Sequence, residues 1–458
     1  MKFCFIRNLH KTILLLLALC SMHIQAQTLS QSPYGRFGLG DLKNTPSPYQ
    51  QALGGLSKAI GDSNSLSFNQ PAALAYLESG VTIFEAGLSG TQTDYVYSNR
   101  STTGNTAGFG YFGLAFPISK KFWNASISLT PVSNVGYTLR DTINNSLSGD
   151  AYLTYAGAGG YSAFSMTHAF KLGKNFSLGV QLDYVFGRTD YSSTVFFPSA
   201  LNNGNRNSLV TRSNRINGFD VNTGLIYRKY FKKRRQGDAS KPAKDSLHLT
   251  LGATFHPITD IKGSYSYLAQ TFFGNAPGTL SIAGTNDTVL YIGQQAGTVT
   301  MPVQYGGGLT LGNSSQKWLF GAEYVYTNWN DFRLFGLADS VKSSYRLAAG
   351  LQIIPSGINT TGKVNYFKRV RYRAGFNYSD GLLSVNGKRL PEMELSLGFG
   401  FPVVLRTYNT RPATSMLNVS VSAGRRGVRN TNPLVEEYVR ITLGFSLNDR
   451  WFRKVKYD

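Results

Sequence analysis

The feature that most constrains this chain is a two-residue alternation of apolar and polar side chains. From Val439 to Leu447 every large apolar residue occupies an odd position, and Arg, Thr, Gly and Ser fill the positions between. Because side chains of a β-strand point alternately to its two faces, this segment predicts a strand with one apolar and one polar face. Segments of this kind, separated by turn residues, are the signature of a transmembrane β-barrel. The same pattern recurs at 176–186, 247–255, 393–401 and 417–423.

The first 26 residues have the features of a secretory signal peptide. Three cations precede an apolar run from Ile13 to Leu19, and the segment ends at the small residue Ala26. Cys20 suggests lipidation, but Leu19 stands where a lipoprotein signal carries a small residue. Both cysteines of the chain lie within this segment. We therefore expect a mature chain without disulfide or thiolate chemistry in the cell envelope.

No later apolar run approaches the roughly 20 residues that a transmembrane helix requires. A membrane location therefore requires a barrel, and we expect an all-β, antiparallel transmembrane barrel of about 14 strands over residues 81–447, followed by a periplasmic tail at 448–458. The strands are expected near 81–98, 107–118, 123–139, 159–172, 176–197, 207–230, 247–264, 299–312, 318–334, 343–354, 369–384, 391–402, 415–425 and 437–447.

The connections between these strands predict the orientation of the barrel. An even strand number returns the C-terminus to the side of the N-terminus, and barrels of this class have short periplasmic turns and longer external loops. The short connections at 119–121, 172–175 and 313–316 are therefore expected on the periplasmic side. The long polar stretches near 140–158, 265–298 and 425–436 are expected to be external loops.

The chain is strongly basic, with a formal charge of +22 that falls to +19 when the three signal cations are removed. A secreted chain does not meet nucleic acid, so we assign the charge to contact with anionic lipid or a periplasmic protein partner, or to solvated turns. One periplasmic connection is long and basic, and it is interpreted either as a solvated turn or as a partner or lipid contact. Its cations are Arg228, Lys229, Lys232, Lys233, Arg234 and Arg235.

Residues 27–80 do not alternate like the barrel strands and are rich in Gly, Pro, Ser and Ala. About 54 residues are too many for a simple leader and too few for an independent core. A hatch that plugs the lumen, where the barrel wall supplies the missing burial, fits both limits. We therefore predict that this segment folds inside the barrel.

Three stretches of the chain together resemble one family. They are 32–41 with the following Asn69-Gln70-Pro71-Ala72-Ala73-Leu74, then Met301-Pro302 with Trp318 and 322–329, and finally 372–378 with 398–402. On these residues the chain resembles the FadL/TodX (OMPP1) family of outer-membrane transporters for hydrophobic compounds, in the form common among Bacteroidetes-type bacteria.

The resemblance implies a fourteen-stranded barrel closed by an N-terminal hatch, with an apolar ligand passing through the wall. It assigns the hatch motif to Asn69, Pro71 and Ala72, although Gln70 interrupts the family's Asn-Pro-Ala element. In the third strand, Pro131 removes a ladder donor, and Asn134 and Gly136 follow closely. These three residues mark either a strand end near the rim or, by resemblance to the family's kinked third strand, a lateral opening.

The sequence offers little for catalysis, for a metal or for a cofactor. Of the three histidines after the signal, His248 and His256 lie eight residues apart on one strand, roughly 26 Å at about 3.3 Å per residue. His168 has no serine or carboxylate partner that the pattern dictates, so we expect neither an enzyme nor a histidine-built metal site. The inward charges are expected to pair with one another or with the hatch, and they are Asp183, Glu323, Glu394 and Arg440.

Two functions remain. The first is passive uptake of hydrophobic small molecules, of the long-chain fatty acid or aromatic hydrocarbon class, by lateral diffusion through the wall into outer-membrane lipid. The second is an adaptor or scaffold subunit of an outer-membrane secretion or assembly complex, with the ligand pathway unused. An apolar pocket that continues into the wall break favours the first, and a basic periplasmic rim favours the second.

Overall fold

The computed structural model describes residues 32–43, 47–98, 100–119, 122–145, 149–197, 206–231, 246–272, 287–358, 364–385, 387–404 and 414–450. The expected signal peptide, the residues 232–245 of the basic connection and the tail beyond Arg450 lie outside the described residues. Within the described ranges, no helix is long and apolar enough to cross a membrane.

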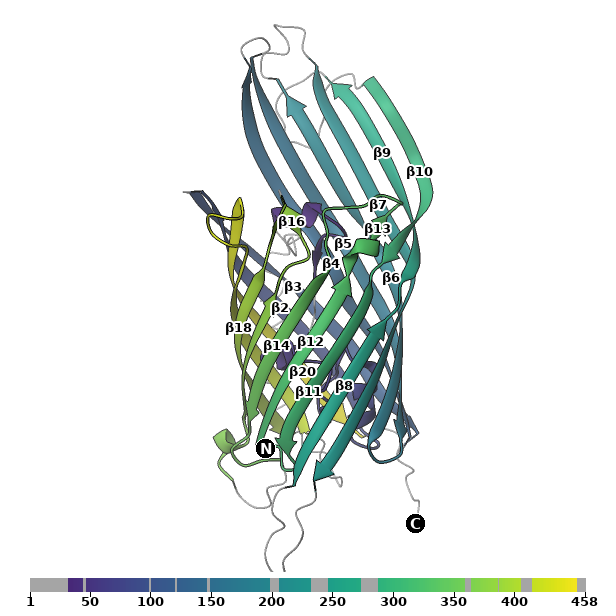
Figure 1. Cartoon of the computed structure of the whole chain (residues 1–458), viewed down its shortest axis with the longest axis vertical. Helices are drawn as coiled ribbons and strands as arrows, with labels where there is room; N and C mark the ends of the chain where they lie inside the picture. The colour runs from purple at the N-terminus through teal and green to yellow at the C-terminus, as the bar shows by residue number, and fades with distance from the viewer. Residues whose placement is uncertain are drawn as a thin grey trace, which may run out of the picture.

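The wall is a closed antiparallel barrel of fourteen strands, as expected from the alternation (Figure 1). Two of the fourteen are interrupted, and each is formed by a pair of shorter strands, β8 with β9 and β10 with β11. The barrel closes where the first wall strand pairs with the last, from Thr82 opposite Asp449 to Tyr97 opposite Leu434. The wall strands are β2 (Thr82–Tyr97), β3 (Arg100–Ser119), β4 (Trp123–Asn145), β5 (Gly149–Leu172), β6 (Phe176–Phe196), β7 (Asn207–Phe231), β8 (Leu247–His256), β9 (Thr259–Phe272), β10 (Asp287–Met301), β11 (Val303–Asn313), β12 (Trp318–Asn328), β14 (Ser344–Ile353), β15 (Arg371–Ser379), β18 (Glu392–Val404), β19 (Thr414–Arg426) and β20 (Leu434–Asp449).

The alternation places apolar side chains outside and polar side chains inside. On β18, Leu395 and Leu397 are 65% and 61% exposed, whereas Glu394 and Ser396 are 5% and 2% exposed. An outward apolar belt with a polar interior is the arrangement that a bilayer requires of a barrel. The predicted orientation of the strand faces is therefore confirmed.

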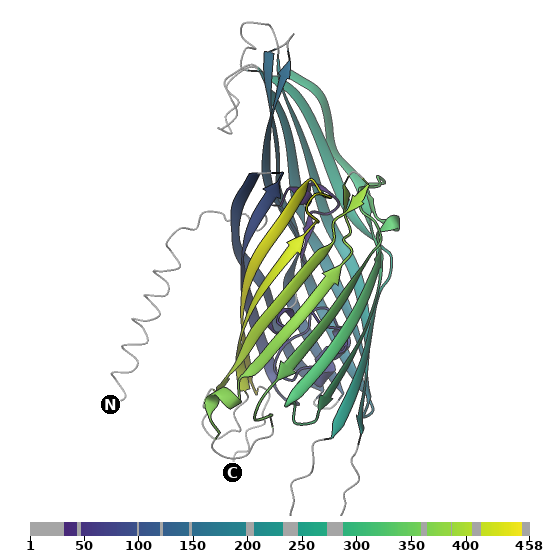
Figure 2. The same cartoon turned by 60° about the vertical axis from the view of Figure 1, so that its left-hand side comes forward.

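One side of the barrel is much taller than the other. Strands β4, β5, β6, β7, β9 and β10 continue well beyond the ends of their neighbours, at the end opposite the short turns (Figures 1 and 2). We call this extension the outer lobe. It consists of residues 135–145, 149–160, 187–196, 207–216, 261–272 and 287–299.

The outer lobe corrects the expectation of long loops near 140–158 and 265–298. Strands β4 and β5 pair without a loop up to Asn145 opposite Gly149, and β9 and β10 pair up to Thr271 opposite Asp287. The polar residues there were interpreted as loops because they lack the apolar side of a lipid-facing strand. The strands of the outer lobe pair with one another through backbone hydrogen bonds, which do not require an apolar, lipid-facing row of side chains.

Residues 32–43 and 47–80 lie inside the barrel, where they are visible in purple (Figures 1 and 2). We call residues 32–80 the N-terminal segment. It has four short elements, η1 (Pro33–Arg36), β1 (Asp41–Leu42), α2 (Pro48–Gln51) and η2 (Pro71–Tyr76). The remaining small elements lie in connections of the barrel, namely η3 (Trp329–Asp331), β13 (Arg333–Leu334), η4 (Tyr366–Lys368), β16 (Ser384–Val385) and β17 (Lys388–Arg389).

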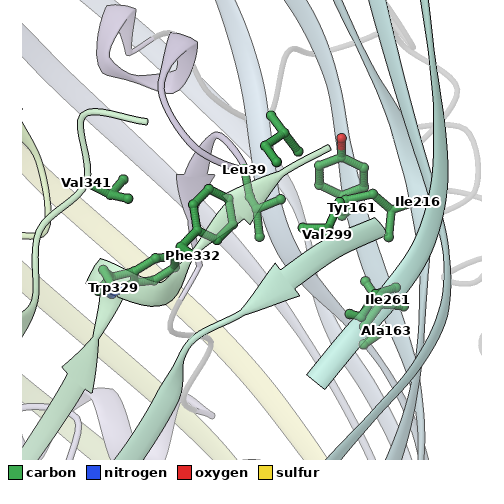
Figure 3. Close-up of a cluster of buried hydrophobic side chains, with 11 residues drawn as sticks. Leu39, Tyr161, Ala163, Ile216, Ile261, Val299, Trp329, Phe332 and Val341 are labelled. Atoms are coloured by element: carbon green, nitrogen blue, oxygen red, sulfur yellow. The ribbon is translucent and has the colours of Figure 1, made fainter. Parts of the chain in front are cut away.

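A buried apolar cluster lies inside the barrel where the interrupted strands bend. Trp329 and Phe332 enter it from the connection after β12, and Leu39 enters it from the N-terminal segment (Figure 3). Wall residues such as Tyr161 and Ile216 complete it at 2% exposure each. This cluster links the upper part of the N-terminal segment to the base of the outer lobe.

Candidate functional site: a filled lumen and a gap in the wall

The N-terminal segment is held to the wall by buried ion pairs. Arg371 on β15 donates to Asp62 at 2.6 Å and to Asn64 at 3.2 Å. The Arg371 and Asp62 side chains are 7% and 6% exposed. Each of these buried charges has lost its hydration, and the attraction between them offsets that cost. Removing either one would leave the other as an uncompensated buried charge.

A second anchor lies on the neighbouring part of the wall. Glu323 on β12 accepts from the backbone N–H groups of Ser57 at 2.6 Å and Lys58 at 2.8 Å. Arg346 on β14 neutralises the same carboxylate at 2.5 Å and reaches the Gly55 carbonyl at 3.5 Å. The expectation that the inward Glu323 pairs with the hatch is therefore met.

Lys58 is buried beside this anchor and donates from Nζ to the Asn69 carbonyl at 3.0 Å. Burial lowers the pKa of Lys58 to about 8, against the opposing attraction of Glu323, and Arg346 lowers it further. Burial in the lumen therefore destabilises the charged form of Lys58 relative to the neutral form.

Close approach of the segment to the wall depends on glycines that face inward. A Cβ at Gly375 would overlap the backbone of Gly54, and a Cβ at Gly179 would overlap Pro71 and Ala72. Only a residue without a side chain allows two backbones to approach this closely. Inward glycines approach the backbone of the segment at Gly179, Gly252, Gly350 and Gly375, and they approach its side chains at Gly113, Gly224, Gly321, Gly398 and Gly444.

The upper lumen is polar and internally neutralised. Arg426 bridges Asp41 of the N-terminal segment at 2.9 Å and Glu436 of β20 at 3.3 Å, and Arg440 pairs with Glu394 at 3.2 Å. Although burial opposes it, the cations Lys43 and Arg426 hold the pKa of Asp41 well below its usual range. A cavity of about 270 Å³ has Asp41, Glu394, Arg426 and Arg440 in its lining, so it suits water or ions better than an apolar solute.

The wall is open between β3 and β4 above the middle of the barrel. Their pairing runs only from Ser119 opposite Trp123 to Phe112 opposite Leu129, although β3 continues to Arg100. Pro131 follows immediately, at a register shift in the pairing of β4 with β5. Above Leu129 the two strands are therefore separate edges of the wall.

The N-terminal segment occupies the lowest part of this gap. β1 pairs with β4, Asp41 opposite Asn134 and Leu42 opposite Ser133, and Lys43 N–H donates to the Val132 carbonyl at 2.9 Å. These bonds satisfy backbone groups that lipid cannot satisfy. The upper part of the gap borders a chamber.

The chamber has a volume of about 960 Å³ and lies between β4–β6 of the outer lobe and the β2–β3 hairpin, with η1 as its floor. Its lining is largely aromatic and aliphatic, with Arg36 and Arg100 as its basic residues. Asp190, paired with Arg188, also lines the chamber. The larger apolar lining residues are Tyr34, Phe37, Tyr95, Tyr97, Tyr137, Leu139, Tyr191, Val385 and Leu434. An apolar chamber beside a wall break was the feature expected to favour transport.

The structure separates the residues of the predicted hatch motif from most of the predicted opening. Pro71 and Ala72 are buried against β6 and β7, whereas Pro131 lies on β4. Asn69 and Pro131 share the lining of one cavity of about 230 Å³, which includes neither Pro71 nor Ala72. Asn69 therefore lies near Pro131, whereas Pro71 and Ala72 pack on another part of the wall.

The other residues of the predicted opening lie on β4 at different levels. Asn134 pairs with β1, and Gly136 lines the chamber. Their part in a lateral route remains a prediction.

Gln70, which departs from the family motif, has defined partners. Its Nε2 donates to the Lys58 carbonyl at 2.6 Å and to the Ala253 carbonyl at 3.2 Å, and its Oε1 accepts from Ala72 N–H at 3.3 Å. It is completely buried. Gln70 therefore caps η2 and ties it to β8.

The basic connection is only partly described, because Lys232, Lys233, Arg234 and Arg235 lie outside the described residues. Arg228 points into the barrel, where it donates to Gly61 at 3.3 Å and lies over the Tyr76 ring at 3.9 Å. It therefore binds the N-terminal segment, which the sequence did not indicate. Lys229 is exposed at the end of β7.

The three histidines are separate. His256 contacts Asp220 at 2.6 Å and the Pro302 carbonyl at 3.2 Å, so both of its ring nitrogens have partners. His248 is buried on the inner face of β8, and His168 accepts from Trp123 on the outside of β5. Groups of three or more metal-ligating side chains do not occur among the described residues.

Fold and site together define a closed, fourteen-stranded barrel of the outer-membrane type, with an N-terminal segment in its lumen and a gap in its wall. The chain belongs to the BamG family, whose model matches residues 8–458. A search of curated proteins gave no match.

Solved structures share the architecture. The toluene transporter TodX of Pseudomonas putida is 16% identical, with a TM-score of 0.53 over 90% of this chain and 100% of that one. The toluene transporter TbuX of Ralstonia pickettii is 14% identical, with a TM-score of 0.52 over 87% and 97%. A FadL homologue of Pseudomonas aeruginosa is 14% identical, with a TM-score of 0.50 over 90% and 100%. At these identities the similarity establishes a FadL-like channel fold.

Proposed function

We propose that this protein is an outer-membrane channel that admits apolar small molecules laterally, through the gap between β3 and β4. The observation that carries the proposal is the continuity of the 960 Å³ apolar chamber with that gap. A solute of the aromatic hydrocarbon or long-chain fatty acid class would enter the chamber from outside the cell and leave between the two strand edges into lipid. The process is passive diffusion, without a chemical step, cofactor or metal.

The filled lumen supports a lateral route over an axial one. An apolar solute moving down the axis would have to displace buried ion pairs such as Arg371 with Asp62, whereas the chamber offers apolar contact from the start. We therefore propose that residues 27–80 act as a permanent plug. The partners of the channel are then its ligand and the surrounding lipid.

Uptake of labelled toluene and labelled oleate by cells that express the full chain tests the proposal. Leu139→Trp fills the chamber and should slow uptake of the transported class at least fivefold. Thr142→Trp, on the same strand but outside the chamber lining, is the matched control and should leave uptake unchanged. Equal uptake by both variants and by cells without the protein would exclude the channel.

A second function, an adaptor subunit of an envelope complex, is favoured by a different observation. The N-terminal segment is anchored on β8, β12, β14, β15 and β18 to β20, so the lumen is filled by a fixed structure. A barrel of this kind can act as a rigid membrane platform. Purification from native membranes in mild detergent tests this role, because an adaptor should retain stoichiometric envelope proteins and a free channel should not.

A further inference from the structure

The outer lobe has a strand edge without a partner on the side that faces the gap. β4 pairs with β3 only up to Leu129 and with β1 only at Ser133 and Asn134. Between Gly136 and Asn145, β4 pairs with β5 on one side, and none of the described residues pairs with its other side. An open row of backbone donors and acceptors is a template for another strand.

The backbone pattern shows which residues of β4 offer these groups. Val132 accepts from Lys43 on the edge side, and backbone groups of an antiparallel strand turn alternately to its two neighbours. The pairing of β4 with β5 has no register shift beyond Ser133. Even positions, including Thr138, therefore present their N–H and C=O groups to the free edge.

The other long edge of the outer lobe is built differently. β10 has two register shifts against β9, between Thr288 and Leu290 and between Ile292 and Gln295. Bulges of this kind protect an edge from unwanted pairing. The β4 edge has neither a shift nor a proline between Gly136 and Asn145, so it remains suited to pairing.

The surroundings of the β4 edge indicate the chemistry of its occupant. Tyr137 and Leu139, at odd positions, line the apolar chamber and offer pockets for alternate apolar side chains. The exposed Arg36, Arg100 and Arg140 lie on the elements around the edge, and none of them forms an ion pair within the part of the chain that the structure describes. The edge is therefore apolar on one side, and the three arginines around it outnumber Asp141, the exposed acidic residue of the same stretch of β4.

We propose that β4 residues 136–144 bind an extended, acidic polypeptide segment of a cell-surface protein by strand addition. Main-chain hydrogen bonds to the even positions would supply affinity, alternate apolar side chains would enter the chamber, and flanking carboxylates would pair with the three arginines. The pairing would extend the short β1–β4 ladder that the chain already forms with itself. This inference goes beyond channel function, since strand addition requires no transport.

The proposal is tested with the purified full-length barrel and a fluorescent eight-residue peptide of alternating leucine and threonine between terminal aspartates. Thr138→Pro removes one edge donor without removing a β4–β5 bond, and it should weaken peptide binding at least tenfold. Thr138→Val keeps the donor and should stay within twofold of the parent. A peptide with terminal lysines should bind at least fivefold more weakly. Hydrogen exchange of residues 136–144 should slow when the aspartate peptide binds.

Several outcomes would overturn the proposal. Equal binding to the Pro and Val variants would show that the peptide enters the chamber without strand pairing. Displacement of the peptide by dodecane, with no effect of Thr138→Pro, would identify a hydrocarbon pocket instead. A dimer that Thr138→Pro dissociates, without peptide binding, would identify a second copy as the occupant. A difference in electrophoretic migration between unboiled and boiled samples, equal to that of the parent, would show that each variant folds. Uptake measured separately would distinguish loss of the channel from loss of the strand edge.

Discussion

Replacing Arg371 by methionine should loosen the N-terminal segment by a calculable amount. The substitution leaves the Asp62 carboxylate, 6% exposed, without its partner at 2.6 Å. Removing one member of a buried pair costs about 3–5 kcal/mol. Because about 1.4 kcal/mol corresponds to a factor of ten, the fraction of barrels with a displaced segment should rise roughly 100- to 4000-fold.

The displaced fraction can be measured with a single introduced thiol. The chain has no cysteine after residue 20, so Ala73→Cys, at a position 4% exposed, provides a unique buried label site. A water-soluble maleimide reaches it only when the segment leaves the wall, and the labelling rate then follows the displaced fraction.

Two further variants distinguish loss of the buried ion pair from a general loss of stability. Combining Arg371→Met with Asp62→Leu removes both charges and should return most of the lost stability. Arg429→Met breaks an exposed pair with Glu437, 60% and 36% exposed, and should change labelling less than fivefold. Labelling of Arg371→Met within twofold of the parent would show that the pair does not hold the segment, and the reasoning would fail.

Three other perturbations test separate parts of the structure. Gly375→Ala places a Cβ on the backbone of Gly54 and should raise ion conductance in planar bilayers, whereas Gly307→Ala, with open space around its Cβ, should not; equal conductance would refute the close-approach argument. Burial lowers the pKa of Lys58 from 10.5 to about 8, so between those pH values the displaced segment binds more protons than the seated one, and seating should strengthen as pH rises. The labelling rate of the parent divided by that of Lys58→Met at the same pH, a ratio that cancels ionisation of the thiol, should therefore fall over that window, and a constant ratio would refute the role of Lys58. Pro131→Val restores a ladder donor beside the gap and should slow uptake of an apolar solute with normal folding; wild-type uptake would remove Pro131 from the route.

The sequence predicted the wall well because a lipid-facing strand has a simple periodic constraint. The alternation around Leu395 and Leu397 and the short turns at 172–175 and 313–316 correspond to the structure. The outer lobe was missed because strands outside the bilayer are free of that constraint, and their polar residues resemble loops. The alternation predicted the number of wall strands, but it did not predict that some of them extend much further than the others.

The contacts inside the lumen were predictable only in part. The inward position of Glu323 followed from strand parity, but its partners Ser57 and Lys58 lie over 260 residues away in sequence, and no local pattern encodes them. Arg371 and Asp62 were missed for the same reason. Glycines at inward positions of successive strands were the one available signal for a closely seated segment.

Planar-bilayer conductance of the full chain, compared with a variant that lacks residues 27–80, tests the central claim most directly. The claim is that the N-terminal segment fills the lumen and leaves only the lateral gap as a route. The full chain should be nearly silent, and the deletion variant should insert as a barrel with large, nonselective conductance to small ions. Equal conductance of the two proteins would contradict the claim.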